Sequence, residues 1–289
     1  ATVSRQWEHR RLALMRAMAA GEVPLLVAAV EGLLQRTLPP EELDRAWAEL
    51  RTGGSYDLNQ LAETLTAAGY SRCDQVEGVG QFALRGGILD VYSPGMEQPV
   101  RAEFFGDELD AMGLFDPATQ RRTENVERAV LLPAAEALPH LAPGGTAGLA
   151  ARLEKLAAGA EKAGRHELAQ TLRQDREALE QGRSFPATDR YLALIYPQLA
   201  TAADYLPPDA CVLFSESSRV GERAKTYQWQ LEEDAKSLME RGELDGSCAV
   251  LSRTFPELNA RLSDWPTAYL DSFTLSAYPV PPGCLLSVT

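Results

Sequence analysis

A series of short strands separated by glycine and proline turns constrains the fold of this chain more than any other feature. It extends over residues 70–133. Strand-forming side chains surround a Gly-Gly pair at 86–87, a Pro-Gly pair at 94–95 supplies a turn, and residues 100–105 alternate as a further strand. This part of the chain is therefore predicted to form a small strand-rich domain.

The strand at residues 100–105 is predicted to have two different faces, because successive strand side chains point in opposite directions. The inward set is Val100, Ala102 and Phe104. The outward set is Arg101, Glu103 and Phe105. An exposed phenylalanine between charges is a candidate protein contact, since aromatic and arginine side chains dominate binding hot spots. The pattern leaves open whether a neighbouring strand or helix of the same domain covers Phe105 instead.

The segments before these strands alternate helix and strand. Residues 4–50 are predicted to hold a helix, an apolar strand at 25–30, and a second helix that starts at the acidic residues 41–42 after two prolines. Residues 57–69 follow as a short amphipathic helix that ends at a glycine. The order up to residue 50 indicates an α/β layer; the Gly-Gly pair at 53–54 ends it, and a new domain that includes the helix at 57–69 is expected to begin there.

The segments after the strands also mix helix and strand. A Pro-Gly-Gly linker at 143–145 precedes one long helix over 147–180. Residues 211–214 are predicted to form a buried strand and residues 219–241 a helix, and a short apolar segment stands at 285–286. The alternation predicts an α/β domain with some parallel strands. Three domains are thus expected, over residues 1–50, 51–137 and 138–289.

Charge and hydropathy limit the partners of the chain. Its 289 residues carry a formal net charge of −13, a poor electrostatic match for a phosphate backbone. Protein surfaces with basic patches are the expected partners, and affinity for duplex DNA is expected to be weak. No run approaches the roughly 18 apolar residues of a membrane span. The chain also opens without a basic-then-apolar leader, so no membrane partner and a cytoplasmic location are expected.

The cysteines and histidines do not indicate a metal site or a disulfide framework. Four cysteines are scattered without a C-x-x-C pair, and three histidines do not stand at metal-ligand spacing from them or from one another. No metal and no cofactor are therefore expected.

Signatures of catalysis are missing as well. No Gly-Lys dipeptide occurs, so this chain lacks the phosphate-binding loop that places a lysine on the β- and γ-phosphates of a nucleotide. The apolar residues 212–214 are followed by Ser215 and Glu216, where a helicase would place an Asp-Glu pair to hold Mg²⁺. No catalytic residue is assigned, and this part of the protein is not expected to be an enzyme by itself.

Three stretches of the strand-rich region resemble one known domain. Residues 85–92 read RGGILDVY, residues 99–110 read PVRAEFFGDELD, and residues 115–121 read FDPATQR. They closely resemble domain 2 of UvrB and of bacterial transcription-repair coupling factors. The DQVEG sequence at 74–78 and the TQR ending favour the coupling factors over UvrB.

The resemblance implies a fold in which a small α+β domain 2 is inserted into degenerate, helicase-like α/β layers. The expected parts are part of domain 1a (residues 1–50), domain 2 (residues 51–137) and domain 1b (residues 138–289). Domain 2 would bind UvrA. The family's contact positions correspond to Arg85, Arg101 and Phe105, with Glu103 on the same face.

The implied function is that of a UvrA-binding adaptor module in transcription-coupled nucleotide excision repair, without ATPase activity of its own. The parent protein would bind RNA polymerase and translocate on DNA with ATP, but through other domains. The alternative is a piece of UvrB, the DNA-loading ATPase subunit of excision repair. Two positions depart from the family pattern: Gly113 stands where an arginine is frequent, and Ala102 replaces a larger aliphatic residue.

Overall fold

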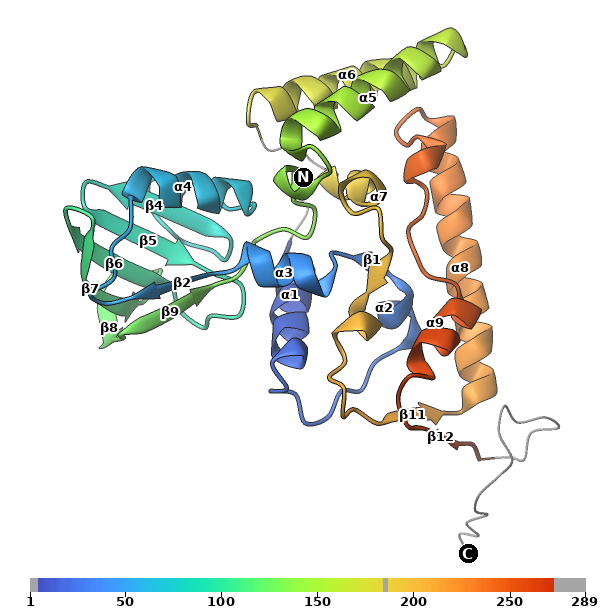
Figure 1. Cartoon of the computed structure of the whole chain (residues 1–289), viewed down its shortest axis with the longest axis horizontal. Helices are drawn as coiled ribbons and strands as arrows, with labels where there is room; N and C mark the ends of the chain where they lie inside the picture. Colours follow the sequence, from blue (N-terminus) through green and yellow to red (C-terminus); the bar gives the residue numbers. More distant parts are fainter. Residues whose placement is uncertain (1–4, 184–186, 273–289) are drawn as a thin grey trace, which may run out of the picture.

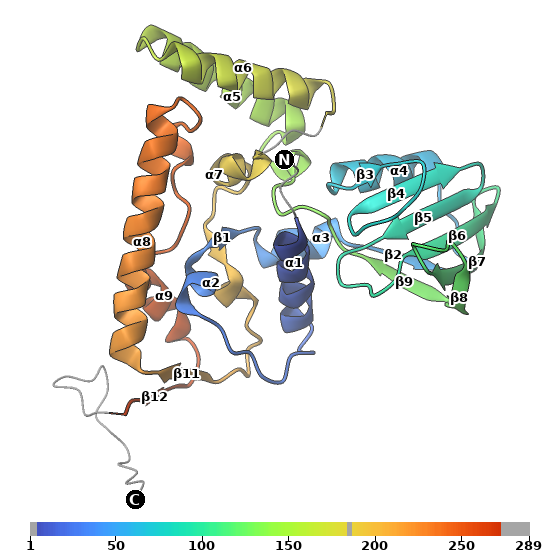
Figure 2. The same cartoon turned by 180° about the vertical axis from the view of Figure 1, so that it is seen from behind.

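The chain forms a strand-rich part and a larger, mainly helical part (Figure 1). The computed structural model describes residues 5–183 and 187–272. The strand-rich part lies to one side, and the helical part contains segments that precede it and segments that follow it in the sequence (Figure 2). The protein is therefore mixed α/β with several sheets, in agreement with the sequence, while the helicase-like arrangement of layers stays a prediction.

Six strands form the main sheet, in the order β3-β4-β5-β6-β7-β8. Their bounds are Ser71–Arg72 (β3), Gln81–Arg85 (β4), Ile88–Tyr92 (β5), Val100–Phe105 (β6), Glu108–Phe115 (β7) and Arg122–Asn125 (β8). Neighbouring strands run antiparallel except β3 and β4, which are parallel. A separate antiparallel pair, β2 (Ala48–Arg51) with β9 (Arg128–Leu131), joins the two ends of this part of the chain. The turn predicted at 86–87 connects β4 to β5, and residues 100–105 form a strand as predicted.

One helix, α4 (Leu58–Ala67), covers the apolar face of the sheet (Figure 1). It begins where predicted because the Asp57 carboxylate accepts hydrogen bonds from two otherwise unpaired backbone N–H groups of its first turn. Its buried side chains Leu61 and Leu65 lie in one apolar cluster with the fully buried Phe82 of β4. This packing leaves the other face of β4, β5 and β6 free of the helix.

The first segment of the chain is more helical than the sequence indicated. Its elements are α1 (Gln6–Ala19), α2 (Val30–Leu34), β1 (Arg36–Thr37) and α3 (Pro40–Ala46). The two helices predicted in this segment are confirmed as α1 and α3. The strand predicted at 25–30 is wrong. That stretch has no regular structure until α2 begins, and Leu25 and Val27 are exposed. An apolar run becomes a strand only where a partner strand accepts its hydrogen bonds, and no strand within residues 5–183 and 187–272 pairs with this stretch.

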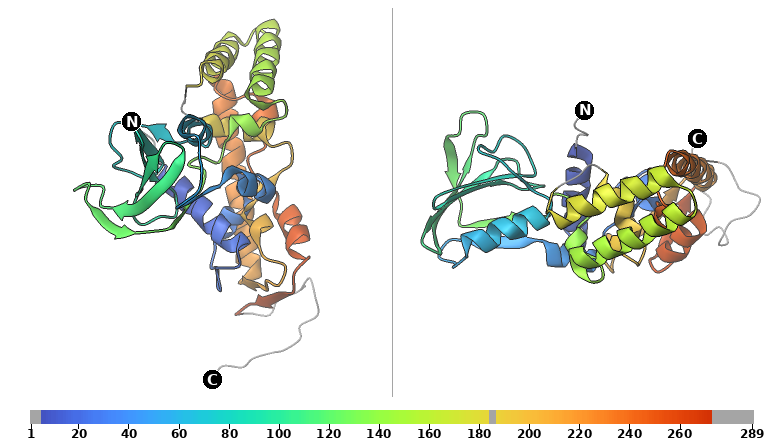
Figure 3. Two further views of the ribbon diagram at one scale, coloured as in Figure 1. Left: turned by 60° about the vertical axis from the view of Figure 1, so that its left-hand side comes forward. Right: turned by 90° about the horizontal axis from the view of Figure 1, so that it is seen from above.

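The long helix predicted over 147–180 is wrong in one respect, because the structure has two helices there. They are α5 (Gly145–Lys162) and α6 (His166–Glu180), which lie side by side as a hairpin (Figure 3). The break falls at Gly164, whose φ of +73° lies in the left-handed region that glycine adopts most readily. Each helix buries an apolar stripe, and the two helices pack against each other.

The remaining segment combines short helices with two small sheets. Its elements are the 3₁₀ helices η2 (Thr188–Tyr191), η3 (Ala202–Tyr205) and η4 (Gly246–Cys248), the α-helices α7 (Leu192–Ile195), α8 (Ser217–Glu240) and α9 (Phe255–Leu262), and the strands β10 (Ala200–Thr201), β11 (Val212–Ser215) and β12 (Thr267–Leu270). One further 3₁₀ turn, η1 (Pro139–Leu141), precedes α5. Strand β10 pairs antiparallel with β1, and β11 pairs parallel with β12. The parallel pairing confirms the sequence-based expectation of some parallel strands.

The strand predicted at 211–214 is present one residue later but is not buried. In β11 Phe214 is buried and its ring stacks on Tyr269 of β12, and Val212 packs partly against the same core, while Leu213 is exposed. A sheet of two strands leaves one of its faces open unless other elements cover it, which explains the difference. The apolar segment at 285–286 lies outside the described residues.

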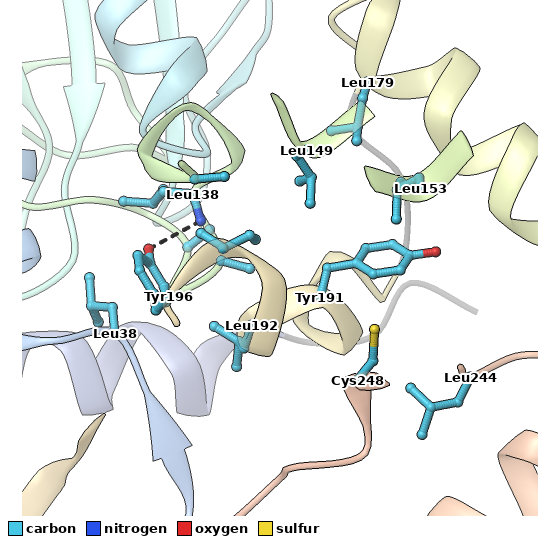
Figure 4. Close-up of a cluster of buried hydrophobic side chains, with 14 of the residues drawn as sticks. Leu38, Leu138, Leu149, Leu153, Leu179, Tyr191, Leu192, Tyr196, Leu244 and Cys248 are labelled. Atoms are coloured by element: carbon cyan, nitrogen blue, oxygen red, sulfur yellow. Dashed lines mark hydrogen bonds between the residues drawn. The ribbon is translucent and has the colours of Figure 1, made fainter. Parts of the chain in front are cut away.

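The first and last segments share one apolar core (Figure 4). In it Leu38 of the first segment and Leu138 of the linker lie close to Tyr196, and Tyr191 lies beside Cys248. The Tyr196 hydroxyl donates to the Glu136 carbonyl at 2.8 Å. The helical part is thus one packed body interrupted in sequence by the sheet, whereas the predicted domain boundaries stay a prediction.

Polar contacts of Glu136 and Ala134 dock the strand-rich part onto α1. The buried Glu136, just after β9, forms an ion pair with Arg11 and accepts from the Thr37 hydroxyl at 2.6 Å. His9 lies 3.0 Å from the Ala134 carbonyl, and burial lowers the pKa of its imidazole.

None of the described helices is both long and apolar enough to cross a bilayer.

Candidate protein-binding site

The site residues predicted from the sequence lie on the face of the sheet opposite α4. In the register of the sheet, Ile88 of β5 stands opposite both Arg85 of β4 and Glu103 of β6. Directly opposed residues of a sheet share a face. Phe105 follows Glu103 at the two-residue spacing of that face. Arg85, Ile88, Arg101, Glu103 and Phe105 are called the Phe105 face below.

Phe105 is the most exposed aromatic side chain on this face, with 85 % of its surface accessible. It ends β6, immediately before a tight turn at Gly106. No described strand or helix covers it, so of the two readings left open by the sequence the exposed one holds. Large apolar side chains in such positions are costly to hydrate and are typical of protein contacts.

Phe104 points to the other face, as predicted, but it is only partly buried. It packs against the sheet core and meets the ring of Tyr56 edge-on, with 6.3 Å between ring centroids. Its truncation is therefore expected to cost less stability than truncation of a fully buried phenylalanine. The alternation of β6 continues through this point, because the irregular register between β6 and β7 places the extra residue, Asp110, in β7.

A buried carboxylate organises the two arginines of the face. Asp90 lies in β5 between them, and its side chain has no accessible surface. Arg101 donates to both of its oxygens, from Nε at 2.7 Å and from Nη2 at 2.8 Å. Arg85 donates to Oδ2 at 2.7 Å. One negative charge thus faces two positive charges, and the hydrogen bonds to Asp90 raise the pKa of Arg101.

Further contacts hold Arg101 in place. Its guanidinium lies 4.6 Å from the centroid of the Phe115 ring and donates to the backbone and side-chain oxygens of Gln120 at 3.4 and 3.2 Å. Gln120 has a φ of 60°, an uncommon value for a residue other than glycine. Only 21 % of the Arg101 side chain is accessible. Truncation of Arg101 is therefore expected to lower the stability of the domain, since it takes two hydrogen bonds from a buried carboxylate.

Glu103 is also paired, in this case with Arg122 of β8. The guanidinium reaches it across Gly113, where a Cβ atom would lie 2.7 Å from Arg122 Nε and 2.9 Å from the Glu124 carbonyl. Gly113, one of the two departures from the family pattern, therefore makes room for an arginine from the neighbouring strand. The positive charge on this part of the face comes from β8 instead of β7.

Several residues of the site were missed by reasoning from the sequence. They are Asp90, Phe115, Gln120 and Arg122. Of these only Asp90 carried a usable signal, because a lone carboxylate within the apolar strand Ile88–Tyr92 needs a buried partner. The partners of the others come from strand register and a turn conformation, which local sequence does not specify.

The position that resembles a helicase acid pair has a different arrangement. Glu216 follows β11 with a φ of 58° and accepts from the Ser272 backbone at 3.1 Å. The adjacent Ser217 backbone donates to Asp271 at 2.6 Å. Both carboxylates are thus engaged within the chain. Across residues 5–183 and 187–272, no group of three or more His, Cys, Asp or Glu side chains is arranged to hold a metal ion.

A large groove lies elsewhere, between the strand-rich part and α1. It has a volume of about 2160 Å³ and is lined by residues of α1, α4, β3 and the linker at 135–140. The charged pairs Arg5 with Glu8 and Arg11 with Glu136 line it and are satisfied within the chain. The Phe105 face is separate from this groove.

Comparisons with known proteins place the Phe105 face in an interaction domain. Residues 48–136 match the family described as UvrB interaction domain, a span that runs from the start of β2 to Glu136. The chain is 32 % identical over 251 residues to the transcription-repair-coupling factor of Bacillus subtilis, covering 84 % of this chain and 21 % of that protein. It is 30 % identical over 291 residues to that of Staphylococcus haemolyticus, covering 96 % and 24 %. Over 115 residues it is 39 % identical to that of Myxococcus xanthus, covering 40 % and 10 %.

The fold and these matches define the class of protein. It contains a UvrB interaction domain, in which α4 packs on one face of the sheet and no described helix covers the Phe105 face. Over most of its length the chain is similar to transcription-repair-coupling factors. It spans about a fifth to a quarter of the length of the first two relatives, at 21 % and 24 %.

Proposed function

We propose that this chain is the UvrA-binding adaptor module of a transcription-repair coupling factor and acts in transcription-coupled nucleotide excision repair. The observation that carries the proposal is the 85 % exposure of Phe105 on the same face of a UvrB interaction domain as the half-exposed Arg85. Catalysis is not part of the role, since no nucleotide-binding loop is present in the sequence. RNA polymerase and DNA would be engaged through other domains of a longer, cytoplasmic protein.

The chemistry of the Phe105 face suits a protein partner. An exposed aromatic ring offers apolar area at low conformational cost, and an arginine fork beside it gives direction through its donors. A complementary surface on UvrA would supply an apolar pocket for the ring and an acidic or carbonyl acceptor for the guanidinium. Strand-borne side chains are held more rigidly than loop side chains, which favours recognition without rearrangement.

Calorimetric titration of the protein with UvrA tests the proposal. Saturable binding that is weakened by Arg85→Ala and unchanged by Trp229→Ala is the expected result. Trp229 is a suitable control because it is 60 % exposed on α8, in the helical part. Absence of binding, or equal loss in both variants, would exclude the Phe105 face as the site.

The chain is expected neither to hydrolyse nor to bind ATP tightly. A lysine for the β- and γ-phosphates is missing, and the carboxylate of Glu216 is engaged by Ser272. Equilibrium dialysis with labelled ATP and a phosphate-release assay measure this. Saturable binding at micromolar ATP would contradict it.

Duplex DNA is expected to bind no more tightly than about 10⁻⁴ to 10⁻⁶ M at physiological salt, the non-specific range. The reason is the net charge of −13, which repels the phosphate backbone. Fluorescence anisotropy with a labelled duplex gives the affinity and its salt dependence. A complex that forms at nanomolar protein would show that the chain has a DNA site of its own.

A further inference from the structure

The carboxylate of Asp90 has an unusual environment for a residue in a strand of a small sheet. It has no accessible surface, and all three of its charged hydrogen bonds come from two arginines on neighbouring strands. A buried carboxylate needs compensation, but a single arginine fork already provides it. The second arginine is therefore more than Asp90 requires for its own burial.

The two arginines are not equivalent. Arg101 is fixed from several sides, by both Asp90 oxygens, by Gln120 and by the ring of Phe115, and little of it is accessible. Arg85 uses Nη2 for Asp90 and Nη1 for the Asp74 carbonyl at 3.2 Å, and 49 % of its side chain is accessible. A guanidinium has five N–H donors, so Arg85 keeps donors that face solvent.

We propose that Asp90 is a positioning residue for partner recognition, which holds Arg85 in the conformation that meets UvrA, with Arg101 as the anchor of Asp90. The inference rests on the proposed function. Asp90 balances only one of the two positive charges of Arg85 and Arg101. The remaining positive charge is then the element that the partner recognises, and the matching group on the partner is a carboxylate. Phe105 supplies the apolar contact beside it.

The physical basis is preorganisation. A free arginine side chain samples many rotamers, and association must restrict them. Asp90 imposes that restriction in the unbound protein, so Arg85 meets its acceptor without this loss. Removal of the anchor is expected to weaken binding by about tenfold, the upper range for one immobilised side chain.

A double-mutant cycle separates positioning from a general structural role. UvrA affinity is measured for the protein and for its Arg85→Ala, Asp90→Asn and Arg85→Ala/Asp90→Asn variants. Asp90→Asn is expected to weaken binding about tenfold when Arg85 is present and less than about twofold when Arg85 is absent. Equal losses in both backgrounds would overturn the proposal, because Asp90 would then act independently of Arg85.

A loss of stability in the Asp90 variant is tested separately from the loss of affinity. Asn at position 90 keeps the shape but leaves Arg101 without its anion, so unfolding is followed in parallel. Should Asp90→Asn fail to fold, the pair of substitutions Asp90→Val and Arg101→Met replaces the buried ion pair with apolar side chains of similar volume, a change that folds tolerate. In that background Arg85→Ala is expected to have almost no further effect on affinity; an undiminished effect contradicts the proposal.

The positioning claim has a readout that does not involve UvrA. In ¹⁵N spectra of the free protein, the signal of the Arg85 Nη2 group that donates to Asp90 is expected to be resolved and protected from exchange, and to lose that protection in Asp90→Asn. If this occurs while the unaltered protein fails to bind UvrA, the proposed function fails and the positioning stands. Binding of UvrA together with an unprotected Arg85 signal in the unaltered protein would instead overturn the positioning alone.

Discussion

Phe105→Ala is expected to weaken UvrA binding by about 2 kcal/mol, roughly thirtyfold, and to leave the melting temperature unchanged. The ring is 85 % exposed, so its removal takes little from the folded state. On a partner surface it would become buried, and the lost contact then appears in the affinity alone. Calorimetric titration and thermal unfolding of the same sample measure the two effects.

Trp229→Ala is the matched control for Phe105→Ala. It removes an exposed aromatic ring of similar size from α8 and is expected to change neither UvrA affinity nor stability. If Phe105→Ala lowers the melting temperature while affinity stays the same, the ring belongs to the core of the domain and the assignment of the Phe105 face is wrong.

Phe82→Ala is expected to have the opposite outcome, a loss of about 3 to 5 kcal/mol in the free energy of unfolding. Phe82 is fully buried in β4, within the cluster that α4 closes with Leu61 and Leu65. Its truncation leaves a cavity between sheet and helix that neither can fill without moving. Denaturant unfolding monitored by circular dichroism gives the value.

The half-buried Phe104 provides the comparison for Phe82. It retains contact with Tyr56 and with solvent, so Phe104→Ala is expected to cost clearly less than Phe82→Ala. Equal costs at both positions would mean that the sheet and α4 do not pack as described. A loss of less than about 1 kcal/mol for Phe82→Ala would lead to the same conclusion.

The strand-rich part was largely predictable because its signals are local. The turn residues at 86–87 and the alternation at 100–105 are sufficient to define β4, β5 and β6. The same holds for α4, whose start is fixed by the side chain of Asp57 and whose apolar stripe faces the sheet. In these elements local preference and tertiary packing agree.

The predictions were wrong where tertiary contacts determine the structure. The apolar residues 25–30 resemble a strand, yet no described strand pairs with them. The helical pattern at 147–180 does not distinguish one long helix from a hairpin, because Gly164 lowers helix propensity without stopping a helix by itself. In the site, the exposure of Phe105 followed from alternation, whereas the covered state of Arg101 did not. That state depends on Phe115 and Gln120, which the register of the sheet brings to it.

Hydrogen–deuterium exchange of the protein with and without UvrA tests the central claim most directly. Binding through the Phe105 face predicts slower exchange in the peptides that contain the β4–β5 turn and the end of β6, and unchanged exchange in α5, α6 and α8. Protection in the helical part with none at β4 to β6 would show that UvrA binds elsewhere and would contradict the account.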